Sequence, residues 1–386
     1  MHAQTASNVS ERLKEDPFRD QLKQFEKCRF DAKKSEAFFK EIGPKEIQVW
    51  EKAVENGYPI AQYFYAQCLH NGYGVAKDQD AAMNWFRKSA EGGLPIAMSC
   101  IGAHFEFDSK EKNLIQAIKW YQKAAALDDS DGMYLLGRNS LSDKRNKDDL
   151  DLALSWLKKS ADFGNPAAMY QLGVYSESLN NIEGFKVAAE WYRKASEQNV
   201  AVAMNRLSQL YMVGRGFVAD EKKAFQWMLK AAEAGDPDSM LEVAKFLKLG
   251  YGVEKNLRES QKWILSATKK FEEGAKRKEI YSVRKLASMY WQGLGVTKNK
   301  SEAVNLLRAA AKLGDQRSKD LLLEMVLNEE LVSRDGILIS SKTSGDLSQI
   351  RVIDSPLLNG LEIRQKLPPA FELRCDYLAE ESPPSK

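Results

Sequence analysis

Residues 153–164 read ALSWLKKSADFG and residues 224–235 read AFQWMLKAAEAG, and related segments recur along most of the 386-residue chain. Seven of the eight tryptophans hold the central position of this motif, at intervals of 35 or 36 residues. A fixed period of this length is typical of stacked supersecondary units, so the motif predicts one repetitive array rather than several unrelated domains. The seven residues are Trp50, Trp85, Trp120, Trp156, Trp191, Trp227 and Trp263.

A second motif lies 23 or 24 residues before each tryptophan after Trp50. It has a small residue, an apolar residue four positions later and a second small residue at the fifth position. In a helix these positions share one side, and small side chains there let another helix approach closely. The opening residues are Ala61, Ala97, Gly132, Ala168, Ala203 and Ser239, with a seventh unit from Ser282 that has Leu306 in the tryptophan position.

Each unit is therefore predicted to be a hairpin of two helices. Residue types that tolerate a left-handed backbone recur at a constant distance after the tryptophan position. They are expected to form the C-terminal cap of the second helix. Proline then opens several of the next first helices, for example Pro166 and Pro237. The predicted cap residues are Gly93, Asp128, Gly164, Asn199, Gly235 and Gly314. Because a recurring aromatic residue is most often buried, the seven tryptophans are predicted to be core residues.

The link inside the hairpin reads NGYGVAKDQD in unit one and LGYGVEKNLR in unit six. Together with the patterns A-x-x-x-L-G and A-x-x-W-x-x-K-A-A-x-x-G, it resembles the Sel-one-like repeat family, a relative of the tetratricopeptide repeats. The resemblance covers Ala61 to Gly314 and implies an all-α fold, a right-handed α-α superhelical solenoid of helical hairpins. Units two, three and four lack the glycine pair in this link, so their turns are expected to differ.

Five regions are predicted along the chain. A seven-residue insertion between Trp263 and Ser282 is expected to lengthen a helix or bulge a loop. After 335 the sequence alternates short branched segments with Ser-Pro, Asn-Gly and Pro-Pro, which favours strands or extended chain. The regions are an N-terminal tail and capping helix (1–43), a half-repeat helix (44–58), seven repeats (59–315), a C-terminal capping helix (316–334) and an extended or strand-like segment with a disordered end (335–386).

The amino-acid composition limits the classes of partner that the chain is expected to bind and the cellular compartment in which it is expected. Lysine and arginine number 57 against 54 acidic residues, so the net charge of +3 gives little support for binding along a phosphate backbone. No apolar stretch reaches the length of a membrane span, and the first residues lack the apolar centre of a signal peptide. We therefore expect a cytoplasmic protein, or a periplasmic one if the N-terminus has been truncated. The four cysteines are too scattered for a disulfide scaffold and are expected to be buried thiols.

Residues that support catalysis are scarce. The glycine pairs lack the further residues of a dinucleotide or phosphate loop, so no cofactor is expected. Cys68, His70, Cys100 and His104 match no standard zinc spacing, and no metal site is predicted. An enzyme would have to place its site in the C-terminal 52 residues, which contain no histidine. We therefore predict that the chain is not an enzyme.

Binding residues are expected on the side of the first helices that faces away from their partner helix. In tetratricopeptide-like arrays that side lines the concave groove, and the resemblance implies the same here. Aromatic and arginine side chains there are the types enriched at protein interfaces. Trp291, the eighth tryptophan, is the favoured single anchor. The candidates are Tyr63, Gln67, His70, Tyr134, Arg138, Tyr170, Glu177, Asn205, Gln209, Met212, Lys245, Lys248, Arg284 and Trp291.

These features predict a non-catalytic scaffold that binds a protein through its concave face. Bacterial members of the resembled family act as adaptors, host-contact factors and immunity proteins, which implies a secreted antibacterial effector as one possible partner. An adaptor in signalling or envelope assembly is the alternative. Nucleic-acid binding is a weaker alternative, because glutamates interrupt its best basic run. That run is Lys269, Lys270, Lys276, Arg277 and Lys278, interrupted by Glu272, Glu273 and Glu279.

Overall fold

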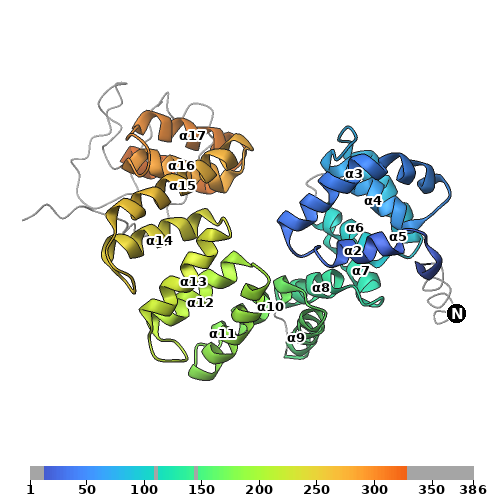
Figure 1. Cartoon of the computed structure of the whole chain (residues 1–386), viewed down its shortest axis with the longest axis horizontal. Helices are drawn as coiled ribbons and strands as arrows, with labels where there is room; N and C mark the ends of the chain where they lie inside the picture. Colours follow the sequence, from blue (N-terminus) through green and yellow to red (C-terminus); the bar gives the residue numbers. More distant parts are fainter. Residues whose placement is uncertain (1–12, 108–111, 143–146, 328–386) are drawn as a thin grey trace, which may run out of the picture. The chain divides into compact units, whose positions relative to one another are not determined.

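The computed structural model describes residues 13–107, 112–142 and 147–327, which form helices α2 to α18 and no strand (Figure 1). The chain divides into two compact units, Met1–Ala267 and Thr268–Lys386, and the boundary falls inside α15 (Leu257–Lys276). Each unit is considered by itself below. The predicted strand-like segment 335–386 and the end of the predicted capping helix 316–334 lie outside the described residues.

Two helices per repeat confirm the predicted all-α array of hairpins. Contacts within each hairpin join α4 to α5, α6 to α7, α8 to α9, α10 to α11, α12 to α13 and α16 to α17. The first helices are α4 (Pro59–Asn71), α6 (Pro95–Phe107), α8 (Ser130–Ser142), α10 (Pro166–Ser178), α12 (Ala201–Val213), α14 (Pro237–Leu249) and α16 (Ile280–Gln292). The second helices are α5 (Gln79–Glu91), α7 (Leu114–Ala125), α9 (Lys147–Asp162), α11 (Ile182–Glu197), α13 (Glu221–Glu233), α15 and α17 (Lys300–Lys312).

The terminal helices differ in part from the predicted boundaries. α2 (Arg19–Glu26) lies within the N-terminal helix expected from the sequence. The predicted boundary between 43 and 44 falls inside one continuous helix, α3 (Ala32–Glu55), which contains Pro44. The insertion after Trp263 lengthens a helix, because α15 has 20 residues where α5, α13 and α17 have 13. α18 (Gln316–Leu327) packs on α17 within the second unit.

The predicted helix caps are confirmed by their backbone angles. All six cap residues have positive φ, including Asp128 at 60° and Asn199 at 61°, which are not glycine. In the four hairpin links that contain the glycine pair, those of units one, five, six and seven, both glycines also have positive φ. The second of them touches the preceding repeat: a Cβ added to Gly252 would lie 2.1 Å from the carbonyl oxygen of Glu221. The glycine pair therefore turns the chain and also lets adjacent repeats pack closely.

The tryptophans are core residues to different degrees. Trp50 is completely buried, which confirms its predicted core role, whereas the other six are half-buried and the prediction holds for them only in part. In five of the six, the lysine three residues later places its Nζ over the indole, at 3.8 Å from the ring centre for Lys88 on Trp85 and 4.3 Å for Lys194 on Trp191. Such a cation–π contact covers the outer face of the ring while the charge stays in water.

The residue after the tryptophan position is the one that fills each hairpin core. These residues are Phe86, Tyr121, Leu157, Tyr192, Met228, Ile264 and Leu307, and all are buried. In two hairpins this residue is a tyrosine that lies against a glycine, the second small residue of the first helix. A Cβ on Gly102 would lie 2.4 Å from the Tyr121 ring, and one on Gly173 would lie 2.5 Å from the Tyr192 ring. Hairpins with tyrosine at this position therefore require glycine opposite it.

Cys68 is expected to be chemically inert in the folded protein. It is buried in the core of the first repeat, and burial raises the pKa of its thiol to about 12, so almost no thiolate forms near neutral pH. Iodoacetamide at pH 8 should leave Cys68 unmodified in the native protein and modify it fully in urea, as read by peptide mass spectrometry. Equal labelling in both conditions would contradict this prediction.

Candidate functional site

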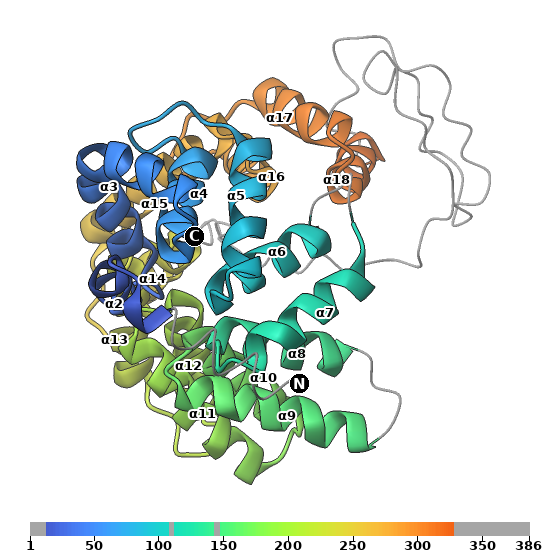
Figure 2. The same cartoon turned by 90° about the vertical axis from the view of Figure 1, so that its right-hand side faces the viewer.

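The first helices line the inner side of the curve in the first unit. Figure 2 shows α8, α10 and α12 on that side and α9, α11 and α13 on the outer side. Successive first helices contact each other there, α6 with α8 and α8 with α10. Side chains on the inner side can therefore interact between repeats, and a partner placed on the curve would meet them.

Repeats two and three share a polar and aromatic cluster on this inner side. The hydroxyl of Tyr121 donates a 2.7 Å hydrogen bond to Glu106, which also forms an ion pair with Arg138 of the next repeat. The Arg138 guanidinium lies 5.4 Å from the ring centre of Phe107 and 5.7 Å from that of Tyr134. Burial and the hydrogen bond to Glu106 raise the pKa of Tyr121, so this hydroxyl remains a neutral donor. The cluster thus holds Arg138 in a fixed position between two aromatic rings.

A related cluster occurs 71 residues later, in repeats four and five. Tyr192 donates a 2.7 Å hydrogen bond to Glu177, as Tyr121 does to Glu106. The Tyr170 and Tyr192 rings lie 5.7 Å apart, and Arg206 of the next first helix interacts with Tyr170 and Glu177. The inner side therefore carries two similar tyrosine–glutamate–arginine clusters, two repeats apart.

The other predicted binding residues have varied environments. Tyr63 is only 2% exposed and packs against Phe25, so the prediction that it contacts a partner is wrong. Arg284 in the second unit is held by Asp315 at 2.8 Å, and Lys300 lies over the half-buried ring of Trp291. These contacts give Arg284 a structural role within its unit.

The remaining candidates lie on or near the surface. Gln67 donates to the hydroxyl of Tyr63 at 3.0 Å, and Gln209 donates to Asn205 at 2.8 Å. Asn205 in turn donates to Ser239 of the next repeat at 3.3 Å. His70 and Gln209 are exposed, whereas Gln67, Asn205, Met212, Lys245 and Lys248 are half-buried. The structure brings Tyr134 together with Arg138, and Tyr170 together with Glu177; the other residues are not part of these two clusters.

The N-terminal part of the chain lies along the starts of the first helices. The side chain of Asp16 accepts a 3.2 Å hydrogen bond from the backbone nitrogen of Ile60, at the start of α4. That helix has no side-chain cap of its own. Trp50 donates from Nε1 to Gln21 at 3.0 Å, so α2 covers the half-repeat as predicted. This part of the chain also contacts repeats beyond the half-repeat. The sequence did not predict these further contacts.

The connection between α2 and α3 reaches repeat three through Arg29. Its Nη2 lies 3.1 Å from Asp129 and 2.6 Å from Asp131, at the start of α8. We call Asp129, Ser130 and Asp131 the acidic niche. Burial by itself lowers the pKa of Arg29, but the charges of Asp131 and Asp129 outweigh it, and the pKa is raised overall. Burial raises the pKa of Asp131 in spite of this ion pair.

Two neighbouring repeats support the niche. Ser99 of repeat two donates to Asp129 at 2.6 Å, and Asn165 at the start of repeat four donates to Asp131 at 2.8 Å. Asp129 also caps α8 by accepting from the backbone nitrogen of Gly132 at 2.8 Å. The two carboxylates are therefore fixed in place by three repeats before Arg29 is considered.

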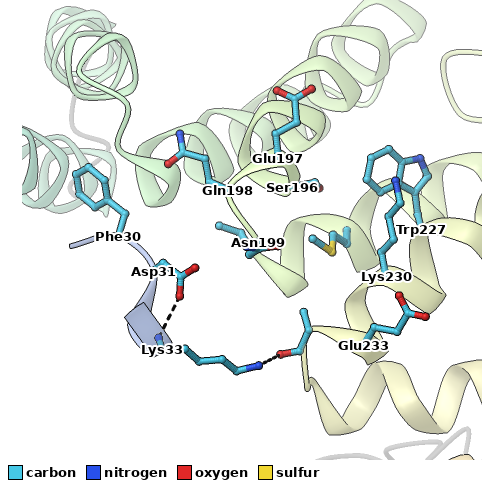
Figure 3. A pocket seen from close by; sticks show the side chains of 13 residues that line it. Phe30, Asp31, Lys33, Ser196, Glu197, Gln198, Asn199, Trp227, Lys230 and Glu233 are labelled. Carbon is cyan, nitrogen blue, oxygen red and sulfur yellow. Dashed lines mark hydrogen bonds between the residues drawn. The ribbon is translucent and has the colours of Figure 1, made fainter. Parts of the chain in front are cut away.

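A cavity of about 800 Å³ lies between this connection, together with the first turn of α3, and repeats four and five. Phe30, Asp31 and Lys33 line one side, and residues 196–200, Met204, Trp227, Lys230 and Glu233 line the rest. Figure 3 shows the Lys33 side chain extending across the cavity, where its Nζ donates to the carbonyl oxygen of Ala234 at 3.0 Å. The α2–α3 connection and the first turn of α3 thus contact parts of the chain 100 and 201 residues away.

Some of these residues had a signal in the sequence. Glu106 occupies the same repeat position as the predicted Glu177, and Asp131 directly precedes the opening small residue Gly132, on the predicted binding side. Arg206 and Phe107 each directly follow, in the sequence, a residue on that predicted side. Arg29 stands outside the repeats, and no local pattern connects it with Asp131.

The repeat geometry agrees with a family model, the Sel1 repeat, which matches residues 59–94, 102–129, 130–165, 166–200, 201–236, 237–270 and 280–315. The chain belongs to the Sel1 repeat family. A Sel1 repeat protein from Oxalobacter formigenes has a similar structure, with 29% identity, a TM-score of 0.50, and coverage of 55% of this chain and 87% of that one. The immunity protein Pa5087 of Pseudomonas aeruginosa shares 22% identity at a TM-score of 0.38, over 49% of this chain and 74% of that chain.

A curated relative is chitin synthase regulatory factor 3 of Schizosaccharomyces pombe. It is 25% identical over 186 residues, which are 46% of this chain. This chain spans only 20% of the length of that relative. The family, together with the hairpin array, makes this chain a Sel1 repeat scaffold for protein–protein interaction. No helix in the described ranges is both long and apolar enough to cross a membrane.

Proposed function

We propose that this chain binds a protein partner on the inner side of its first unit, with Tyr134, Arg138 and Tyr170 as main contacts. The observation that supports this proposal is the fixed position of Arg138 between the Phe107 and Tyr134 rings. Side chains that are already ordered lose little entropy on binding, and tyrosine and arginine dominate many interfaces. Phe107 is 65% exposed, so this cluster has apolar area available for a partner.

The narrower proposal is that the partner is a secreted antibacterial effector, which the chain neutralises. Its support is the resemblance of the repeats to a family that includes immunity proteins. An array of ordered side chains along an open surface suits stoichiometric inhibition of such a partner. An adaptor that joins two cellular proteins is the alternative.

The test uses the purified product of a secreted-effector gene that neighbours the gene for this chain. We expect Tyr134→Ala and Tyr170→Ala each to weaken its binding about 30-fold, the typical loss at an aromatic hot spot. Titration calorimetry measures the affinity, and growth of cells that express the effector measures neutralisation. Tyr251→Ala is the matched control, because Tyr251 is an exposed aromatic residue in a hairpin link of the same unit.

Three results would separate the alternatives. If the two inner-side variants bind as tightly as the unmodified chain, the proposed surface is wrong. If the two variants lose binding but still neutralise the effector, the result would contradict the immunity role. The assignment of the binding surface would still hold. No binding at all to the effector would favour the adaptor.

A further inference from the structure

The α2–α3 connection, taken here with the first residues of α3 as residues 27–33, lies between parts of the first unit that are distant in sequence. On one side α2 is anchored in the core of repeat one, where the buried ring of Phe25 lies 6.0 Å from that of Tyr63. On the other side Arg29 enters the acidic niche of repeat three, and Lys33 bonds to the end of repeat five. The repeats between these points form a curved stack of hairpins, and the connection crosses it by a shorter route (Figure 2).

The niche has the chemistry of a guanidinium site. It offers two carboxylates two residues apart, and Asp129 keeps only 3% of its side-chain area exposed. Ser130 adds a hydroxyl 3.4 Å from Nη2 of Arg29. A planar cation with several donors fits this arrangement better than a point charge does. Without a cation the niche would hold a buried carboxylate that lacks a counter-charge, which is strongly unfavourable.

Arg29 does not use all of its hydrogen-bonding capacity there. Its hydrogen bonds to the niche are made by Nη2, while Nε is buried and has no hydrogen-bond partner among the residues that the structure describes. A buried donor without a partner costs free energy, so the docked state of the connection is less favourable than its ion pairs alone suggest. Because docking is less favourable than the ion pairs alone suggest, the connection is suited to leaving the niche and returning to it.

We propose that the acidic niche is a guanidinium-binding site and that Arg29, seated in it, ties the N-terminal helices to repeats three and five. The tie sets the curvature of the first unit and closes one side of the cavity that Lys33 crosses. Removing the guanidinium opens the cavity and separates Lys33 from repeat five, while the hairpins themselves stay folded. This role is independent of the partner proposed above.

Cross-linking in the full chain tests the tie. Lys33 and Glu233 line the same cavity, so a carbodiimide should join them when the connection is docked. We expect Arg29→Gln to reduce the Lys33–Glu233 cross-link about 10-fold, because docking then lacks its main ion pair. Asp131→Asn should give a smaller reduction, and Arg19→Gln, an exposed arginine on α2, should give none.

Two further measurements make the result decisive. Millimolar ethylguanidinium should restore part of the cross-link in Arg29→Gln, and hydrogen exchange in α4 to α13 should match that of the unmodified chain. An unchanged cross-link in Arg29→Gln would overturn the proposal. So would faster exchange throughout the repeats, which would make Arg29 an ordinary core residue, or a lack of recovery with ethylguanidinium.

Discussion

Trp50→Ala is expected to lower the unfolding free energy of the first unit by about 3–5 kcal/mol, the usual cost of removing a fully buried tryptophan. Trp191→Ala should cost less, because Trp191 is only half-buried and a lysine already covers its outer face. The reason is local: α2 covers Trp50, and Gln21 accepts the hydrogen bond from its indole. Trp191 has only Lys194 over its outer face.

Urea denaturation of the full chain, followed by circular dichroism, measures both variants. Trp50→Phe is the control: it keeps an aromatic ring and most of the buried area, and it should cost less than Trp50→Ala although it also loses the hydrogen bond, at about 1 kcal/mol. Equal losses for Trp50→Ala and Trp191→Ala would show that α2 adds no protection to the half-repeat.

Gly173→Ala is expected to destabilise the first unit by about 2 kcal/mol, although alanine is the better helix former. The added methyl group would lie 2.5 Å from the Tyr192 ring. That ring cannot easily move aside, because its hydroxyl is bonded to Glu177 at 2.7 Å. Overpacking therefore outweighs the gain in helix propensity of up to ~1 kcal/mol.

A double-mutant cycle with Tyr192→Ile separates these two effects. Repeat six already combines alanine with isoleucine at the same positions, as Ala244 and Ile264. In the Tyr192→Ile background, Gly173→Ala should therefore be neutral or stabilising by up to ~1 kcal/mol. If the alanine destabilises both backgrounds equally, the proposed pairing of glycine with tyrosine is wrong.

The repeat itself could be predicted from the sequence because its determinants are local. Cap residues, glycine pairs and the two helical motifs act within one hairpin, and their spacing predicted the array and the cap conformations. For the insertion the sequence left a longer helix and a bulged loop open, and α15 has the longer helix. Burial of the tryptophans was harder to predict, since it depends on what covers each ring. A signal was present all the same: Trp50 is followed three residues later by Ala53, where five other repeats have lysine.

The candidate site could be predicted only in part, for a related reason. A helical projection identified Tyr134, Arg138, Tyr170 and Glu177, which the structure gathers in two clusters. The same projection wrongly selected Tyr63, because the ring of Phe25 from outside the repeats covers it. Contacts made by a non-repetitive segment have no period, so sequence patterns cannot reveal them.

Lys33 and its acceptor Ala234 are 201 positions apart in the sequence, and this separation affects the order in which contacts form during synthesis. Each hairpin can form as soon as its own 35 or so residues leave the ribosome, because its contacts are local. Lys33 emerges long before its acceptor does, and at ordinary elongation rates the wait is roughly 10 to 40 s. During that time the side of Phe30 and Lys33 that lines the cavity is not yet covered by repeat five, which makes a nascent chain stalled before Ala234 a natural substrate for chaperones.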